Sequence, residues 1–141
     1  MILFDTDHVS VLEWERGAEY ERLRARVARE ELAEVATTIV TYEEQTRGWL
    51  AYLAKARTVP QLVNAYQKLI RHVELYRQIE VVEFDERAAQ EYERLLKSRV
   101  RVGTQDLKIA AISLANQALL LSRNLQHFRK VPGLKIEDWT K

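Results

Sequence analysis

The chain has 141 residues, 47% of them hydrophobic, and its 22 basic and 21 acidic side chains give a net charge of +1. These values predict a single globular domain over residues 1–141, exclude a disordered chain, and argue against a protein that holds nucleic acid by charge alone. Cysteine is absent, which excludes disulfides, thiolate zinc sites and a cysteine nucleophile. No segment resembles a membrane span or a signal peptide, so we expect a cytoplasmic protein without a membrane partner.

Four short segments are predicted to be strands buried on both faces of a sheet. Each is continuously apolar or rich in β-branched residues, as parallel strands usually are. The predicted strands are residues 2–4 (ILF), 34–40 (EVATTIV), 81–84 (VVEF) and 118–121 (ALLL). Longer segments of helical character separate them, and this alternation is typical of βαβ units. The predicted fold class is therefore α/β with a central, mainly parallel sheet.

Helices are expected in the intervening segments. Residues 18–31 and 42–55 are rich in charged and helix-favouring side chains. From Pro60 onward, apolar residues recur every three or four positions, which predicts an amphipathic helix with this proline in its first turn. Asp85 is the expected N-cap of the next helix. The segment after Thr104 (DLKIAAISLANQA) is apolar almost all round, as expected of a helix packed centrally against the sheet.

Polar side chains stand at the carboxyl ends of the predicted strands, where open α/β sheets bind ligands. Asp5 follows the first strand and Glu44 follows the second. Asp106 lies in the first turn of the apolar helix, and Asn124 follows the last predicted strand. Further polar residues at the same edge are Asp7, Thr41, Glu43 and Ser122. We therefore expect these residues to converge on one cleft.

Such a cluster of carboxylates predicts a site for Mg²⁺ or Mn²⁺. Neighbouring carboxylates raise one another's pKa unless a hard divalent cation lies among them. A bound ion of this kind activates a water and stabilises the leaving oxygen of a phosphodiester. Taken singly, each residue also has a structural explanation: Asp5 ends a strand, Asp106 favours a helix N-terminus, and Asn124 forms a turn. Only their joint placement favours a metal site.

Four blocks of the sequence resemble, in order, those of PIN-domain ribonucleases of the VapC toxin type. The blocks are LFDTDHVS, TTIVTYEEQTRG with its glycine Gly48, GTQDLKIAAISLA, and LLLSRNLQHFRKVPGLKIEDW. The resemblance covers nearly the whole chain. It implies an α/β/α sandwich, metal-dependent cleavage of RNA, a homodimer, and a cognate antitoxin protein as inhibitor.

The resemblance also implies roles for individual residues. Asp5, Glu44 and Asp106 would be the metal ligands, and Asn124 would occupy the fourth position of the catalytic set. The residues that would orient the substrate or a water are Thr6, Ser122 and His127.

Two positions depart from the family pattern. His127 stands before Phe128, where the family commonly has Asp or Glu, and Asp7 stands where it often has Asn. An imidazole would weaken a second metal site, so either one ion dominates or Asn124 takes the fourth ligand role. The nuclease interpretation needs Asp5 and does not need Asp7.

Two other functions are consistent with parts of the sequence. ILFDTDHV also fits a haloacid-dehalogenase-like phosphatase with Asp5 as nucleophile and Asp7 as acid/base, although ALLLSRN lacks the acidic pair that such enzymes need. His127 and Asn124 are also compatible with an inactive PIN-like interaction module. The long amphipathic helices and the tryptophans are compatible with the core or with partner surfaces, and we expect most of them to pack in the core. The tryptophans are Trp14, Trp49 and Trp139.

Overall fold

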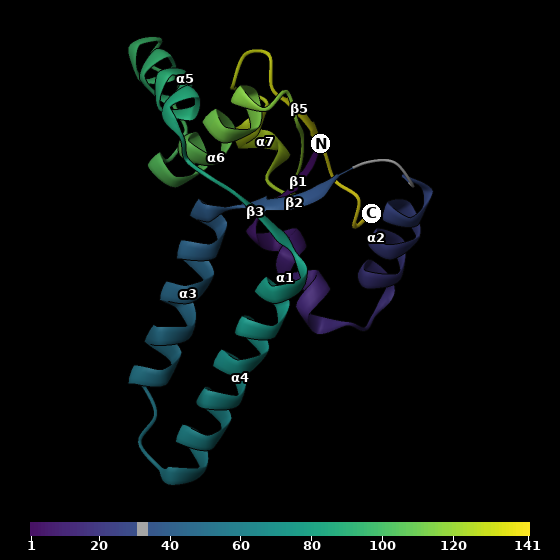
Figure 1. The fold of residues 1–141 in the computed structure, drawn as a ribbon, viewed down its shortest axis with the longest axis vertical. Coiled ribbons are helices and arrows are strands. Elements are labelled where there is room, and N and C mark those ends of the chain that lie inside the picture. The colour runs from purple at the N-terminus through teal and green to yellow at the C-terminus, as the bar shows by residue number, and fades with distance from the viewer. Residues whose placement is uncertain (31–33) are drawn as a thin grey trace.

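A five-stranded parallel sheet forms the centre of the computed structural model, which describes residues 1–30 and 34–141 (Figure 1). The strands are β1 (Ile2–Phe4), β2 (Val35–Thr38), β3 (Glu80–Val82), β4 (Leu119–Leu121) and β5 (Lys135–Glu137). Their order is β3-β2-β1-β4-β5, and every pairing is parallel. The predicted α/β class is therefore confirmed.

Helices cover both faces of this sheet (Figure 1). They are α1 (Thr6–Trp14), α2 (Ala18–Arg29), α3 (Ile39–Ala54), α4 (Val59–Gln78), α5 (Glu86–Lys97), α6 (Thr104–Ala115) and α7 (Leu125–Phe128). On one face, Ile2 and Phe4 of β1 pack against α1 and α2. On the other face, Leu3 of β1 packs against α5, α6 and α7. This arrangement is the α/β/α sandwich that the resemblance implied.

Several predicted elements are confirmed because their signals are local. Asp85 caps α5, since its carboxylate accepts a hydrogen bond from the backbone N–H of Ala88 at 3.0 Å. Pro60 lies in the first turn of α4, which Thr58 and Gln61 close with a capping box. The apolar helix α6 is buried along most of its length. No helix within residues 1–30 and 34–141 is long and apolar enough to cross a membrane.

Other predictions were wrong or incomplete. The second strand ends at Thr38, and residues 39–40 are helical, because the Thr38 hydroxyl accepts a hydrogen bond from the Thr41 backbone at 3.1 Å and caps α3. The sequence did not predict helices α1 and α7 or strand β5. The sequence of β5 is KIE, which is too polar and too short to form an apolar run. Helix α2 ends at Arg29, and the predicted end at Glu31 lies outside the described residues.

The expectation that the amphipathic helices pack in the core is wrong for the α3–α4 hairpin. These two helices extend away from the sheet (Figure 1). The apolar side chains they expose include Leu50, Val59, Leu62, Val63, Tyr66, Ile70 and Val73. The tryptophans also differ from one another, because Trp139 is 3% exposed, Trp14 is 53% exposed and Trp49 is half-buried. The hairpin contacts too little of the sheet to bury its own apolar face.

Candidate active site

The candidate site begins where β1 and β4 end side by side. The parallel register pairs Phe4 with Leu121, so that Asp5 and Ser122 are the next residues along the two strands. The Ser122 hydroxyl donates a hydrogen bond to Asp5 Oδ2 at 2.7 Å. The backbone N–H of Thr6 donates to Asp5 Oδ1 at 2.7 Å. Asp5 is 6% exposed, so its carboxyl group lies at the bottom of the site.

Asp7 also belongs to this cluster, as its place after the first strand predicted, although the nuclease interpretation gave it no role. Its Oδ2 atom lies 3.2 Å from the Ser122 hydroxyl and accepts a hydrogen bond from the backbone of Arg123 at 3.0 Å. Its Oδ1 atom lies 2.7 Å from Nδ1 of the buried His8, which accepts a hydrogen bond from the backbone of Trp139. Helix α1 begins at Thr6, and this turn brings both acids to the same strand end.

Glu44 approaches the cluster from the first turns of α3. The Thr6 hydroxyl donates a hydrogen bond to Glu44 Oε2 at 3.0 Å. The other carboxylate oxygen, Oε1, is buried and has no hydrogen-bond partner among the described residues. A buried oxygen without a donor is costly, so Glu44 Oε1 is the atom in this cluster that most needs a cation or a donor.

Asp106 and Asn124 complete the cluster from α6 and the turn before α7. Asn124 donates a hydrogen bond through Nδ2 to Asp106 Oδ2 at 3.1 Å, and through its backbone to the Ser122 hydroxyl at 3.0 Å. Burial raises the pKa of Asp106, and the nearby His127 imidazole opposes that rise. The structure therefore brings together Asp5, Glu44 and Asp106, as predicted, and places His127 beside them.

The carboxyl groups of the cluster have raised pKa values, which indicates that too little positive charge lies near them to stabilise their ionised forms. Burial raises the pKa of Asp5 to about 7, and the neighbouring Asp7 charge adds to the rise. Burial also raises the pKa of Glu44, with a further contribution from Asp106. A carboxyl group that is half-protonated near neutral pH is a poor structural anion, and a divalent cation among these oxygens would restore its ordinary pKa.

The donor set fits a hard divalent ion, although the side chains do not surround one point. Within the described residues, no three Asp, Glu, His or Cys side chains are grouped closely enough to hold a metal ion as they stand. Each acid is tied to a neutral partner instead: Asp5 to Ser122, Glu44 to Thr6, and Asp106 to Asn124. Carboxylate and amide oxygens are the ligands that Mg²⁺ and Mn²⁺ prefer. The fit therefore requires these side chains to turn from their neutral partners toward the ion.

Known proteins share part of this sequence and its overall fold. No protein-family model matches the chain. A curated relative, Ribonuclease VapC2 of Rickettsia felis, is 38% identical over 40 residues, which are 28% of this chain and only 30% of the relative's length.

Solved structures match over a much longer part of the chain. VapBC-1 from nontypeable Haemophilus influenzae matches with a TM-score of 0.78 and 24% identity, covering 100% of both chains. VapBC2 from Rickettsia felis, bound to a DNA fragment from its promoter, matches with a TM-score of 0.67 and 20% identity over 99% of both chains. VapBC-5 from Mycobacterium tuberculosis is 26% identical over 74% of this chain and 79% of that one, with a TM-score of 0.51. These matches confirm the PIN-like fold and the resemblance to VapC-type proteins.

Proposed function

We propose that this chain is an endoribonuclease that depends on Mg²⁺ or Mn²⁺ and acts as the toxin of a toxin–antitoxin pair in the cytoplasm. The observation that carries the proposal is the meeting of Asp5, Glu44 and Asp106, from three separate elements, in a partly buried cluster where burial raises the pKa of each carboxyl group. The name of the curated relative, Ribonuclease VapC2, and the similarity to VapBC structures support it.

The residues that would hold the ion are Asp5, Glu44 and Asp106, with Asn124 as the fourth candidate. When bound, such an ion lowers the pKa of a water and stabilises negative charge on a phosphate. The Ser122 hydroxyl donates to Asp5 and accepts from the Asn124 backbone, which leaves one lone pair for a water or a donor on the substrate. Thr6 positions Glu44 and leaves Oε1 free to act as the ligand atom.

The alternative of a phosphatase with Asp5 as nucleophile receives little support from the geometry. Both carboxylate oxygens of Asp5 accept hydrogen bonds, and the residue is almost fully buried. A nucleophilic oxygen has to reach an incoming phosphorus atom, whereas a metal ligand can lie at the bottom of a site. Trapping an acyl-phosphate on Asp5 would nevertheless revive this function.

The experiment that tests the proposal is incubation of the purified protein with total RNA, with and without Mg²⁺ or Mn²⁺, followed by mapping of the cleaved ends. We expect cleavage only with the metal, and loss of cleavage in the Asp5→Asn and Asp106→Asn variants. Full activity of either variant, or cleavage in the presence of EDTA, would contradict the assignment.

An inactive interaction module makes a different prediction about metal binding. If Asp5 and Glu44 bind Mn²⁺, an ion concentration of about 100 times Kd should stabilise the fold by about 2.7 kcal/mol and raise Tm. The Glu44→Gln variant, which keeps the shape of the side chain and loses its charge, should show a smaller rise. An unchanged Tm in the wild-type protein would favour the inactive module.

The partners that we propose, besides RNA, are a cognate antitoxin and a second copy of the chain. The exposed apolar side chains of the α3–α4 hairpin support association with protein, because large apolar patches of this kind are usually covered. Light scattering of the isolated chain and co-expression with the product of the adjacent gene test these partners. A stable, fully active monomer that binds no such product would contradict them.

A further inference from the structure

Asp7 lies beside the proposed metal site, but the proposed function gives it no role. Its Oδ1 atom lies 2.7 Å from Nδ1 of His8, and its Oδ2 atom accepts a hydrogen bond from the backbone N–H of Arg123 at 3.0 Å. The His8 side chain is fully buried, whereas that of Asp7 is partly exposed. The orientation of the Asp7 carboxylate therefore depends on a buried imidazole and on the backbone after β4.

The hydrogen bonds of His8 define its tautomer. A backbone N–H is always a donor, so Nε2 of His8 must be the acceptor in its 3.1 Å hydrogen bond with the backbone of Trp139. Nδ1 therefore carries the proton and donates to Asp7 Oδ1. Asp138 is not an alternative partner, because its Oδ1 atom lies 3.6 Å from Nε2 and accepts hydrogen bonds from Thr140. His8 is thus a neutral donor that is oriented by the C-terminal segment.

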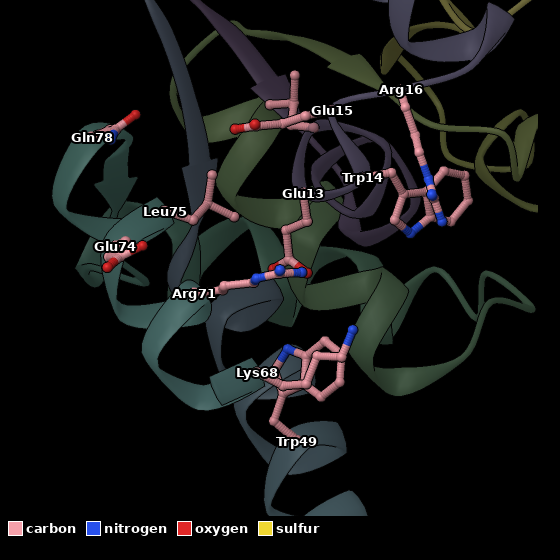
Figure 2. A pocket seen from close by; sticks show the side chains of 11 residues that line it. Glu13, Trp14, Glu15, Arg16, Trp49, Lys68, Arg71, Glu74, Leu75 and Gln78 are labelled. Carbon is pink, nitrogen blue, oxygen red and sulfur yellow. The ribbon is translucent and has the colours of Figure 1, made fainter. Parts of the chain in front are cut away.

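His8 can influence the site only through Asp7. Two cavities adjoin α1, and His8 lines neither of them. The larger, of about 590 Å³, lies at the opposite end of α1, where Figure 2 shows Glu13 together with Lys68 of α4. The smaller, of about 360 Å³, lies between α1 and α3, and Glu13 and Gly48 are among the residues that line it. A ligand in either cavity would not contact the imidazole, which leaves His8 the role of positioning another side chain.

The surroundings of Asp7 require a carboxylate. The His8 imidazole donates to one of its oxygens, and the Arg123 backbone donates to the other. An asparagine has one oxygen and one NH₂ group, so in either orientation its NH₂ group would face a donor. Asp7 and His8 therefore form a matched pair of acceptor and donor.

The Ser122 hydroxyl has one proton and two carboxylate acceptors. Its oxygen lies 2.7 Å from Asp5 Oδ2 and 3.2 Å from Asp7 Oδ2, and it accepts a hydrogen bond from the backbone of Asn124. One proton makes a full hydrogen bond with only one of these carboxylates at a time. Rotation of the hydroxyl group is enough to redirect this hydrogen bond from Asp5 to Asp7, because both acceptors are already within reach.

Asp5 is the proposed metal ligand that most needs such a rotation. Both of its carboxylate oxygens accept hydrogen bonds, one from the Thr6 backbone and one from Ser122. By contrast, Oε1 of Glu44 has no hydrogen-bond partner within the described chain. Asp5 is also almost fully buried, and close packing opposes rotation of the carboxylate. Redirecting the Ser122 hydroxyl to Asp7 leaves Asp5 Oδ2 available to a cation with little movement of the carboxylate.

We propose that Asp7 and His8 are positioning residues of the metal site. Asp7 accepts the Ser122 hydrogen bond when a divalent cation binds Asp5, and His8 holds Asp7 in the orientation that receives it. The hydroxyl group rotates and keeps its proton, so no bond to hydrogen breaks. The inference rests on the proposed function, since it concerns the metal site of that nuclease. The competing explanations are that His8 only stabilises the fold and that Asp7 acts on the ion directly.

Two substitutions of His8 separate its two hydrogen bonds. The amide group of asparagine lies where Nδ1 lies, so His8→Asn keeps a donor to Asp7 and loses the acceptor for the Trp139 backbone. The amide group of glutamine reaches as far as Nε2, so His8→Gln keeps the acceptor for Trp139 and loses the donor to Asp7. Both variants remove part of a buried ring and should lower Tm.

The test measures the Kd of the purified chain for Mn²⁺ by calorimetric titration. We expect Kd to rise about 10-fold in His8→Gln and less than about 3-fold in His8→Asn, because loss of a group that orients a ligand weakens metal binding about 10–100-fold. A purely structural role would make the loss of affinity follow the loss in Tm, and equal increases of Kd in the two variants would overturn the role of His8. The control is Leu95→Val in the core on the other face of the sheet, which should lower Tm and leave Kd as it was.

A double-mutant cycle tests whether the effect passes through Ser122. The Ser122→Ala variant has no hydroxyl group to redirect, so His8→Gln should change the Kd for Mn²⁺ by less than about 2-fold in that background. A rise of about 10-fold that persists without the hydroxyl group would mean that Asp7 acts on the ion directly, and it would overturn the proposed route.

Failure of this inference can be distinguished from failure of the proposed function. NMR of the imidazole nitrogens in EDTA tests the His8 tautomer without metal or substrate, and an Nε2–H tautomer or a doubly protonated ring would overturn the positioning role. A wild-type chain that binds Mn²⁺ and cleaves RNA, but shows no difference between His8→Gln and His8→Asn, would overturn the inference and leave the nuclease intact. A wild-type chain that binds no Mn²⁺ would overturn the metal site and both proposals with it.

Discussion

The acidic edge of the sheet and the projecting α3–α4 hairpin depart in opposite ways from the usual burial of apolar residues and exposure of charged ones. At the sheet edge, acidic side chains are buried or half-buried, and most of their oxygens are paired with neutral donors. On the hairpin, apolar side chains such as Tyr66 and Ile70 are more than half exposed. Burial of like charges is costly without a cation, and exposure of apolar surface is costly without a protein partner. The acidic edge therefore indicates a missing cation, and the hairpin indicates a missing protein partner.

The largest expected effect concerns catalysis at the acidic edge. Removing one ligand charge, as in Asp106→Asn, should lower the rate of RNA cleavage at least about 100-fold, since a metal ion contributes several kcal/mol to transition-state stabilisation. Ile70→Ala on the hairpin should leave folding intact and serves here only as a stability control. Initial rates on one fixed RNA, measured in Mn²⁺, check the difference. Equal rates for Asp106→Asn and the wild-type protein would remove the distinction between the two regions.

The pH dependence of stability tests the charge imbalance at the acidic edge. The pKa of Asp5 is raised from 3.8 to about 7 in the folded protein, so folding takes up a proton at this residue. The stability that Asp5 contributes is fully present below about pH 4 and is lost as the pH rises through its folded pKa. Without divalent ions, the wild-type protein should therefore lose up to about 4 kcal/mol relative to Asp5→Asn over this interval.

Urea denaturation of both proteins in EDTA, at about pH 4 and about pH 8, measures this difference. The other titrating groups are common to both proteins and cancel in the comparison. A difference in stability that does not change with pH would mean that Asp5 is ionised normally without metal. Addition of Mn²⁺ at about pH 8 should restore the stability of the wild-type protein and not that of the variant.

A matched pair of isoleucines compares packing in the two regions. Ile112 of α6 is 0% exposed and Ile70 of α4 is 58% exposed. Ile112→Ala should lower the free energy of unfolding by about 2–5 kcal/mol through lost burial and a cavity. Ile70→Ala should change it by less than about 0.5 kcal/mol. Denaturation of the isolated chain checks both values, and a large loss in Ile70→Ala would show that the hairpin surface is already covered in that state.

The smallest effect concerns the junction between the two regions. Thr38 ends β2 and caps α3 through its hydroxyl, which fixes the start of the helix that carries Glu44. Thr38→Ala should lower stability by about 1 kcal/mol, or a few degrees in Tm. Thr38→Ser keeps the capping oxygen and should lose less. Equal losses in both variants would assign the effect to packing of the threonine methyl group instead of the cap.

Signals contained in a few neighbouring residues predicted much of this fold correctly. Pro60 and Asp85 marked helix starts because a missing N–H and a capping carboxylate act within one turn. The apolar run of α6 predicted its central position, because a helix that is apolar all round can be stable only when it is covered. Asp5, Glu44 and Asp106 were predicted for the site because parallel strands place their carboxyl ends at one edge.

Interactions between distant residues determined the features that the sequence did not reveal. Asp7 was expected at this edge, but its pairing with Ser122, 115 residues away, exists only once β1 and β4 pair. Glu13 and Gly48 share a cavity only because α1 and α3 face each other beyond the end of the sheet.

The sequence by itself determined where most strands and helices of the described chain form, β5 excepted, and which three acids lie at the same edge of the sheet. The tertiary structure decided which oxygens are left without a donor and which apolar faces are left uncovered. The periodicity of apolar residues predicts that a helix has an apolar face, but whether that face is buried depends on the element that packs against it. In α6 it meets the sheet and is buried, and in the outer part of α4 it meets none of the described chain and stays exposed.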